Sequence, residues 1–311
     1  MLITGTNGPD VLNGTISDDE IRGLDGADQI GGSTGNDLIY GNLGNDIIDG
    51  GPDNDSIYGG QGDDAIVGNT GNNLIYGNFG NDSLSAGSGD NITYGGQGND
   101  DIVGGANLDL IYGNLGNDTV VGGNGNDTIF GGQGNDSLGG AGGSDIVYGN
   151  FGNDTIVGTA SGADTLYGGQ GDDSLFEQTG IDTTHGDRMF GNLGADTFDF
   201  TTTAASGQTS VGADHIADFS TAQGDKIRID VTRAMEFIAI SNPSVNSVET
   251  AITAANAALA FDTHDVVFVA GSGTGFLLVD QNSSQGFGTP TDFAIVIENV
   301  TILTPLDIIA I

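Results

Sequence analysis

An aspartate that returns every nine residues is the feature of this sequence that most restricts its fold. The step begins at Asp10, continues to Asp154, and resumes at Asp164 and Asp173 after a one-residue insertion. Glycines stand before these aspartates, as in GNLGND (41–46), and an aliphatic residue stands two places after almost every one. Self-similarity at so short a period means that the chain is a stack of repeats.

The nine-residue unit predicts one turn followed by one short strand. Glycine reaches positive φ without steric cost, so the glycine-rich half turns tightly and exposes its carbonyl groups. In the strand, the aliphatic side chain points inward and its two neighbours point outward. Two units of nine close a coil of eighteen residues, and stacked coils pair as parallel strands around a narrow aliphatic core. We therefore predict an all-β fold, a parallel β-roll (a two-sheet solenoid in which every coil takes two units).

The stacked turns place the aspartates in two columns, one on each edge of the roll. Carbonyl and carboxylate oxygens from successive turns then form cages that contain only oxygen ligands. Such cages suit the hard cation Ca²⁺ rather than zinc or copper. The sequence therefore predicts binding of several calcium ions.

The repeats strongly resemble the RTX (haemolysin-type calcium-binding) family over about residues 5 to 182, with its GGxGxDxUx pattern. The alternative is a disordered glycine-rich tract. The resemblance implies that the first six residues of each unit ligate calcium. Under that reading the metal ligands are Asp28, Asp37, Gly41, Gly44, Asp46, Asp55, Gly59, Gly62, Asp64, Gly77, Gly80, Asp82, Gly95, Gly98, Asp100, Asp109, Gly113, Gly116, Asp118, Gly122, Gly125, Asp127, Gly131, Gly134, Asp136, Asp145, Gly149, Gly152, Asp154, Asp164, Gly168, Gly171 and Asp173.

The second of the two columns is interrupted. The first column contains Asp46, Asp64 and their successors without a break, whereas the second replaces two consecutive aspartates by Asn73 and Asn91. Nearby turns also lose glycines, at Asp53, Ala86 and Asn107. A site between two asparagine-bearing turns lacks both carboxylates, so we predict an empty or weak site there.

The charge of the chain points to the same cation. Acidic residues number 43 against 5 basic ones, which gives a net charge of −38. This charge opposes compact folding unless a cation neutralises it, and it excludes electrostatic binding to nucleic acid or anionic lipid. The chain has no cysteine and no apolar stretch long enough to predict a membrane span. Its first residues, MLITGTNGPD, lack the features of a cleaved signal peptide, so we expect export without one.

An aromatic residue recurs at every second unit, on the outer face of one predicted sheet. The series is Tyr40, Tyr58, Tyr76, Tyr94, Tyr112, Phe130 and Tyr148. At the neighbouring turns, Leu43, Phe79, Leu115 and Phe151 recur at every fourth unit, alternating with glutamines. The tyrosines could serve only to stabilise neighbouring strands. They could also form an apolar patch for a partner or a second copy, and the alternation over two coils favours self-association.

The last third of the chain has a different pattern. Segments GNLGADTFDF (191–200) and DHIADFSTAQGDKIRID (214–230) resemble the region that closes the β-roll in serralysin-type secreted proteases. We expect Phe198, Phe200, Ile216 and Phe219 to plug the end of the roll, since an open stack of strands needs a cap. The predicted domains are a calcium-binding β-roll (1–182), its cap (183–230) and a β-rich C-terminal domain (231–311).

Within the C-terminal domain the pattern predicts one short helix and several strands. Asn246 and Glu249 form a capping box before an apolar stripe that ends at Leu259. Strand-like runs follow at 266–271, 276–280 and 293–303. The ending DIIAI (307–311) resembles the uncleaved signal of type I secreted RTX proteins, and a terminal strand is the alternative.

No catalytic motif emerges, so we predict that the protein is not an enzyme. HExxH is absent, and His185, His215 and His264 are far apart in the sequence. GGSTG (31–35) matches GxSxG but lies inside the repeat, where no strand-turn-helix forms. The resemblance implies a protein secreted by the type I machinery of a Gram-negative-type bacterium, with an extracellular or surface-layer role through self-association. The alternatives are a secretion module related to an extracellular enzyme, and a calcium-dependent adhesin.

Overall fold

The structure is a computed structural model of a chain that forms two compact units, Met1–Asp154 and Thr155–Ile311. It describes residues 1–158, 161–177, 186–200, 214–229, 237–241, 251, 266–270, 274–279, 293–298 and 308–310. The first unit is therefore described in full.

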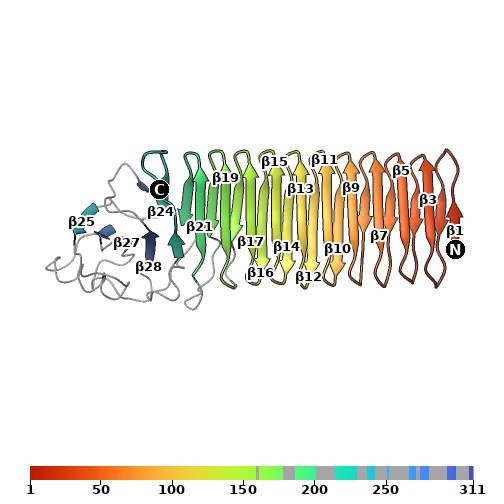
Figure 1. Ribbon diagram of the computed structural model, residues 1–311, viewed down its shortest axis with the longest axis horizontal. Coiled ribbons are helices and arrows are strands. Elements are labelled where there is room, and N and C mark those ends of the chain that lie inside the picture. Colours follow the sequence, from red (N-terminus) through yellow and green to blue (C-terminus); the bar gives the residue numbers. More distant parts are fainter. Residues whose placement is uncertain are drawn as a thin grey trace. The chain divides into compact units, whose positions relative to one another are not determined.

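The first unit consists of two parallel sheets whose strands alternate along the chain (Figure 1). We call them the tyrosine sheet and the plain sheet. The tyrosine sheet contains β1 (Leu2–Thr4), β3 (Glu20–Asp25), β5 (Leu38–Leu43), β7 (Ser56–Gln61), β9 (Leu74–Phe79), β11 (Ile92–Gln97), β13 (Leu110–Leu115), β15 (Thr128–Gln133) and β17 (Ile146–Phe151) in this order. The plain sheet contains β2 (Val11–Asn13), β4 (Gln29–Gly31), β6 (Ile47–Asp49), β8 (Ala65–Val67), β10 (Ser83–Ser88), β12 (Asp101–Ala106), β14 (Thr119–Asn124) and β16 (Ser137–Gly142).

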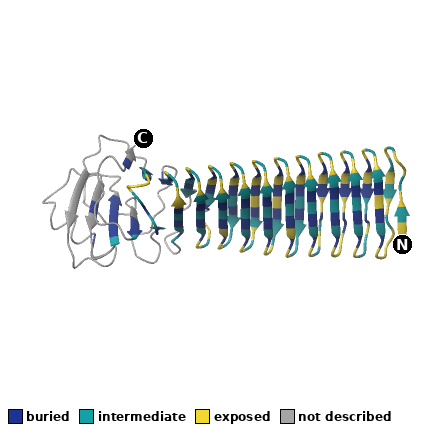
Figure 2. Cartoon of the chain, turned by 45° about the horizontal axis from the view of Figure 1, so that its top comes forward, coloured by how far each residue is buried: buried dark blue, intermediate teal, exposed yellow. Residues whose placement is uncertain are grey.

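The register repeats every 18 residues, so each side chain lies beside its counterpart in the next coil. Tyr40 pairs with Tyr58, and Ile39 pairs with Ile57. From Ile21 onward, the aliphatic residue of each unit in the first compact unit is 0–1% exposed and forms the core between the sheets. Figure 2 shows buried residues along the strands and exposed residues at the turns. One coil departs from the pattern, because β11 places Thr93 in this core.

The second unit has the same kind of parallel pairing within itself and also contains antiparallel strands. Strands β19 (Thr165–Gln170), β21 (Arg188–Leu193) and β23 (Asp214–Ile216) pair in parallel, as do β18 (Thr155–Gly158), β20 (Ser174–Glu177), β22 (Thr197–Phe200), β24 (Lys226–Ile229) and β29 (Ile308–Ala310). Strand β23 also pairs with β28 (Phe293–Glu298), which pairs antiparallel with β27 (Thr274–Val279). Strand β26 (Val266–Ala270) joins β27 to β25 (Phe237–Ser241).

The predicted all-β, parallel two-sheet β-roll with 18 residues per coil is confirmed. The apolar residues expected to plug the roll, Phe198, Phe200, Ile216 and Phe219, are buried. The predicted short helix lies outside the described residues except for Ala251, which is buried. The described residues contain no helix with the length and apolar character that a bilayer crossing needs.

Candidate metal sites

Each turn brings one aspartate carboxylate back against the first glycine of its own unit. A Cβ atom on Gly59 would lie less than 3.0 Å from both Oδ2 of Asp64 and the carbonyl oxygen of Gly77 in the next coil. Gly41 has the same relation to Asp46 and to the carbonyl oxygen of Gly59. We call this space a cradle, bounded by a carboxylate Oδ2 and the carbonyl oxygen of the next coil. Only glycine leaves the cradle free of side-chain atoms.

The other carboxylate oxygen, Oδ1, is bound to the backbone of the preceding coil. The N–H of Asp46 donates to Oδ1 of Asp64 at 2.8 Å, and the N–H of Asp64 donates to Oδ1 of Asp82 at 2.8 Å. In the second column, the N–H of Asp37 donates to Oδ1 of Asp55 at 2.8 Å. These bonds form a ladder along each edge of the roll. Each carboxylate therefore keeps Oδ2 for a different partner.

In the first unit, many of these Oδ2 atoms are buried and accept no hydrogen bond. They belong to Asp28, Asp37, Asp46, Asp55, Asp64, Asp82, Asp100, Asp109, Asp118, Asp127 and Asp136. The residues themselves are only 1–2% exposed. Burying an ionised carboxylate without a partner raises the free energy of the folded state. The folded roll is therefore stable only if a cation or a proton occupies these cradles.

Burial changes the acidity of these carboxyl groups in the same sense. Burial raises the pKa of Asp64 to about 7, and the neighbouring carboxylates of Asp82 and Asp46 add to the rise. In the second column, burial raises the pKa of Asp55 to about 7 and that of Asp109 to about 6. Without a cation, the folded roll therefore holds protons that isolated aspartates would release near neutral pH.

The ligands that the cradles offer fit calcium. Among the described residues, no three histidine, cysteine, aspartate or glutamate side chains gather at one place to hold a metal ion. Each cradle instead combines one carboxylate with backbone carbonyls, and Ca²⁺ takes six to eight such oxygens. The predicted aspartates would supply Oδ2, and the predicted glycines at the start of each turn would supply carbonyls.

The second predicted glycine of each turn has a conformational role. Gly62 has φ +126°, and a Cβ atom there would lie less than 3.0 Å from the carbonyl oxygen of Gly44. A side chain at this position would force neighbouring turns apart. The glycine thus keeps successive turns close enough for their oxygens to share one ion.

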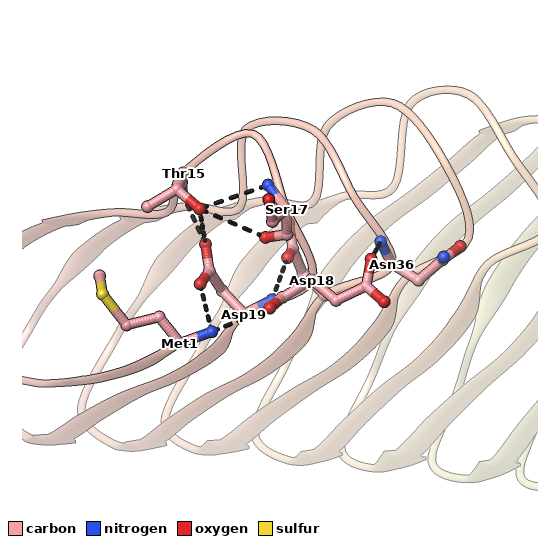
Figure 3. A network of polar contacts seen from close by, with 7 residues as sticks. Met1, Thr15, Ser17, Asp18, Asp19 and Asn36 are labelled. Carbon is pink, nitrogen blue, oxygen red and sulfur yellow. Dashed lines mark hydrogen bonds and ion pairs between the residues drawn. The ribbon is translucent and has the colours of Figure 1, made fainter.

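The first turns of the chain fill their own cradles. Thr15 donates to Oδ2 of Asp19 from its N–H at 2.6 Å and from its hydroxyl at 2.8 Å (Figure 3). Oδ1 of Asp19 lies 2.6 Å from the ammonium nitrogen of Met1, which also donates to the carbonyl oxygen of Asp18. Mainly because of the ammonium group, the pKa of Asp19 is lowered to about 2. Thr6 satisfies Oδ2 of Asp10 in the same way.

The ladder continues beyond residue 182, where the nine-residue step is lost. Asp164 donates to Oδ1 of Asp187 at 2.8 Å, and Asp187 donates to Oδ1 of Asp214 at 3.1 Å. On the other edge, Asp173 donates to Asp196 at 3.0 Å and Asp196 donates to Asp225 at 3.2 Å. These four added positions, Asp187, Asp196, Asp214 and Asp225, were not predicted from the sequence. The signal was present, because each aspartate is followed two residues later by an apolar residue: Met189, Phe198, Ile216 and Ile227.

Comparison with known proteins agrees with this geometry. The family model of the RTX calcium-binding nonapeptide repeat matches the chain in overlapping windows from residue 4 to residue 184. The chain belongs to this family. A search of curated proteins found no match. The RTX assignment covers the cradles of the first unit and supports Ca²⁺ as their cation.

The tyrosine sheet of this RTX chain carries a continuous aromatic ladder. Neighbouring rings from Tyr40 to Tyr148 are stacked, with centroids 4.7–5.1 Å apart and planes within 15° of parallel. The rings are half-buried. Because each ring covers the faces of its neighbours, only ring edges and hydroxyl groups remain towards solvent.

The turns that follow the tyrosine sheet carry a row of exposed apolar side chains. Leu43, Phe79, Leu115 and Phe151 are 40–52% exposed, and glutamines occupy the coils between them. A hollow of about 310 Å³ lies beside Phe151 and is lined by Gln133, Gly134 and Gly152 as well. The corresponding row at the other edge begins with the exposed Ile16 and continues with smaller residues, among them Thr34, Pro52, Thr70, Ser88 and Ala106. We call the first of these rows the apolar row.

The GxSxG match does not form a catalytic arrangement in the RTX roll. Ser33 has φ 81° and lies in the turn between strands β4 and β5. Of the three histidines, only His215 is among the described residues, and it lies 3.4 Å from Glu298. RTX β-roll repeats are typically structural rather than catalytic, which agrees with the prediction made from the sequence.

Proposed function

We propose that this RTX protein folds when it binds calcium outside the cell and then serves as a non-enzymatic structural component that associates with copies of itself. The observation that carries the proposal is the series of buried, unpartnered Oδ2 atoms along both edges of the first unit. Each one lies beside a backbone carbonyl oxygen of the next coil. Calcium is the cation that suits such an oxygen-only environment.

Calcium would couple to folding through these carboxylates. At low calcium the closely spaced aspartates repel one another, and the narrow aliphatic core does not offset the chain entropy. Extracellular sites with dissociation constants of roughly 10⁻⁴ to 10⁻³ M bind at millimolar calcium. The binding free energy then becomes folding free energy, multiplied over many cradles.

Export belongs to this proposal as a consequence of the coupled folding. An unfolded chain in a low-calcium cytosol is suited to passage through a type I secretion channel. The ending DIIAI (307–311) would serve as the signal, although Ile308–Ala310 also forms strand β29. The resemblance of 191–230 to serralysin-type proteins, the domain limits at residues 182 and 230, and the Gram-negative origin remain predictions of the same kind.

The surface of the tyrosine sheet supports self-association better than sugar binding. Carbohydrates are commonly recognised on the exposed faces of aromatic rings, and here each ring covers its neighbours at 4.7–5.1 Å. The apolar row adds exposed side chains at every second coil. Such an apolar surface suits a second copy of the chain. An adhesin that binds sugar through this face is therefore the weaker alternative.

A calcium titration of the full chain, followed by circular dichroism and light scattering, tests both parts of the proposal. We expect β-structure to appear with calcium and large particles to form at the same concentrations. A protein that is fully folded in excess EGTA would contradict calcium-coupled folding. A protein that folds with calcium but stays monomeric would contradict only the self-association.

A further inference from the structure

Asn73 and Asn91 follow the ladder of the second column but offer a different atom to the cradle. The N–H of Asp55 donates to Oδ1 of Asn73 at 3.0 Å, and the N–H of Asn73 donates to Oδ1 of Asn91 at 2.9 Å. The amide oxygen thus occupies the place that Oδ1 of an aspartate occupies elsewhere. The remaining atom, Nδ2, is a hydrogen-bond donor and has no lone pair for a cation.

Rotating the amide does not restore a ligand. If Asn73 were flipped, its Nδ2 would face the N–H of Asp55, and two donors would meet in a buried place. The N–H of Asn73 imposes the same orientation on Asn91. The ladder therefore places an N–H donor, and not a ligand oxygen, in both cradles.

Each Nδ2 group bonds one oxygen of its own turn and one oxygen of the next coil. Asn73 donates to the carbonyl oxygens of Gly71 and Ala86, each at 3.3 Å. Asn91 donates to the carbonyl oxygen of Gly89 and to Oδ1 of Asp109, each at 2.9 Å. The carbonyl oxygen of Ala86 is the counterpart of the Gly77 oxygen that borders the cradle of Asp64. The Asn73 amide thus joins two coils at the place where a cation would join them elsewhere, and the Asn91 amide joins its two coils through Oδ1 of Asp109.

A second observation concerns Ala86, which begins the turn of Asn91. From Gly23 to Gly149, all the remaining turns of the fully described first unit begin with glycine at this position, and Ala86 is the single exception. A Cβ on such a glycine would lie too close to an aspartate Oδ2, as at Gly59 and Gly95. Ala86 has this methyl group and is 0% exposed. The methyl group of Ala86 therefore fills the cradle at the start of the Asn91 turn, where Asn91 offers no carboxylate oxygen.

We propose that Asn73 and Asn91, with Ala86, form a calcium-free clasp in which side-chain amides join the coils of the second column in place of two calcium ions. The inference rests on the proposed calcium binding of the other cradles. It divides the second column into two groups of sites, Asp37 with Asp55 before the clasp and Asp109 with Asp127 after it. The first column has no such division.

Three variants of the full chain test the clasp by the number of calcium ions bound per chain. N73D opens one cradle, A86G/N91D opens the other, and N91D alone leaves the methyl group of Ala86 in place. We expect one additional ion for N73D, one for A86G/N91D, and none for N91D. Equilibrium dialysis with calcium and measurement of bound metal gives the count.

The calcium-free form provides a second readout. N73D removes an amide donor that joins two coils and adds a buried carboxyl group, so we expect its urea midpoint in EGTA at pH 5, where the calcium-free fold is more stable than at pH 8, to fall below that of the wild type. N72D is the matched control, because Asn72 is exposed and its Oδ1 accepts the N–H of Asp90, a bond that aspartate keeps. It adds the same carboxyl group and should change neither the ion count nor the midpoint by a comparable amount.

The outcomes separate this inference from the proposed function. If the wild type binds no calcium, the proposed function fails. If the wild type binds calcium, but N73D and A86G/N91D bind the same number of ions, the clasp is refuted. If N91D gains an ion while Ala86 is retained, the role given to the methyl group is refuted. If a variant fails to fold in EGTA, the ion count in excess calcium still decides the question.

Discussion

The two edges of the first unit share the same hydrogen-bond ladder and differ in the side-chain atoms that face the cradles. Along the first column, Asp28 to Asp136 each present a buried Oδ2 without a hydrogen-bond partner, and the ladder has no substitution. Along the second column the ladder is equally continuous, but Asn73 and Asn91 place donors where the others place acceptors. The edges also differ outwardly, because only the first carries the apolar row.

This difference shows that the ladder and the cradles are separable. Backbone N–H groups need only one acceptor per turn, and either a carboxylate or an amide supplies it. What the turn then offers to a cation depends on the second atom of the same side chain. In our proposal, one atom therefore distinguishes a calcium site from a hydrogen-bonded joint, while the ladder bond itself stays the same.

The largest expected effect is that of pH on the calcium-free fold. Burial raises the pKa of Asp64, Asp100 and Asp127 to about 7, whereas unfolded aspartates titrate near 3.9. The folded state therefore binds more protons, and its stability is fully present below about pH 4 and is lost as pH rises through 6 to 7. We expect β-structure in EGTA to increase from pH 8 to pH 5, measured by circular dichroism.

Folding driven by calcium should depend on pH in the opposite sense and weaken as the pH falls, because protons compete with calcium for Oδ2. The calcium concentration at half-folding should rise when the pH falls from 8 to 6. The side chains of Asn73 and Asn91 do not titrate. In the N73D variant, the calcium concentration at half-folding should therefore depend more steeply on pH than in the wild type. Equal β-structure at pH 8 and pH 5 in EGTA would contradict the protonation argument.

The next largest effect should come from giving the first column the chemistry of the second. D64N/D82N places an amide donor in each of two cradles where the wild type has a buried Oδ2 without a hydrogen-bond partner. We expect the loss of two calcium ions, each of which contributes about 2.7 kcal/mol at calcium concentrations a hundred times Kd. Urea unfolding in excess calcium and the bound-metal count measure the two effects.

D63N is the matched control for this variant. Asp63 is exposed, and its Oδ1 accepts the N–H of Asn81 at 2.8 Å, a bond that asparagine retains. The control removes one charge next to the column but leaves every cradle intact. A loss of stability in D63N as large as in D64N/D82N would mean that net charge, rather than the cradle, is responsible.

A smaller effect is expected from the outer difference between the edges. F79S/F151S removes two large side chains from the apolar row, so we expect the light-scattering signal in calcium to fall several-fold. The calcium count and the circular dichroism spectrum should stay unchanged. Q97S, at the same row in an intervening coil, is the control. Assembly that persists in F79S/F151S would direct attention to the tyrosine ladder.

The smallest effect concerns the core of one coil next to the clasp. Thr93 is 0% exposed, and its hydroxyl has no hydrogen-bond partner in the fully described first unit. T93V exchanges the unsatisfied hydroxyl for a methyl group, so we expect stabilisation by about 1 kcal/mol. Urea unfolding in calcium measures the change. T119V, at an exposed position of the plain sheet, should leave the stability almost unaltered.

The regular part of the fold was predictable because spacing alone determines the register. A constant step of nine places Ile39 beside Ile57 and Asp46 beside Asp64, and no long-range information is needed. The interruption at Asn73 and Asn91 was also visible in the sequence. The direction of the amides was not, because it follows from which atom accepts the N–H of the preceding coil.

The remaining sites were harder to predict because the length of a turn is not constrained by the ladder. Asp187 follows its ladder partner by 23 residues, Asp214 by 27 and Asp225 by 29. An aspartate needs only to arrive beside the preceding coil, however much chain lies between. The hydroxyl groups that fill the first cradles, on Thr6 and Thr15, likewise depend on local contacts that no periodicity reports.

The hydrogen bonds of the ladder also give each column a direction. Every rung runs from an N–H in one coil to an Oδ1 in the following coil, so the peptide donors all point the same way, as they do from Asp46 to Asp64 and from Asp64 to Asp82. A stack built in this way has a head that presents acceptors and a tail that presents donors. If a coil were added in the reversed orientation, its N–H donors would face the N–H donors of the last coil. A roll of this kind can therefore be extended only by coils of the same orientation.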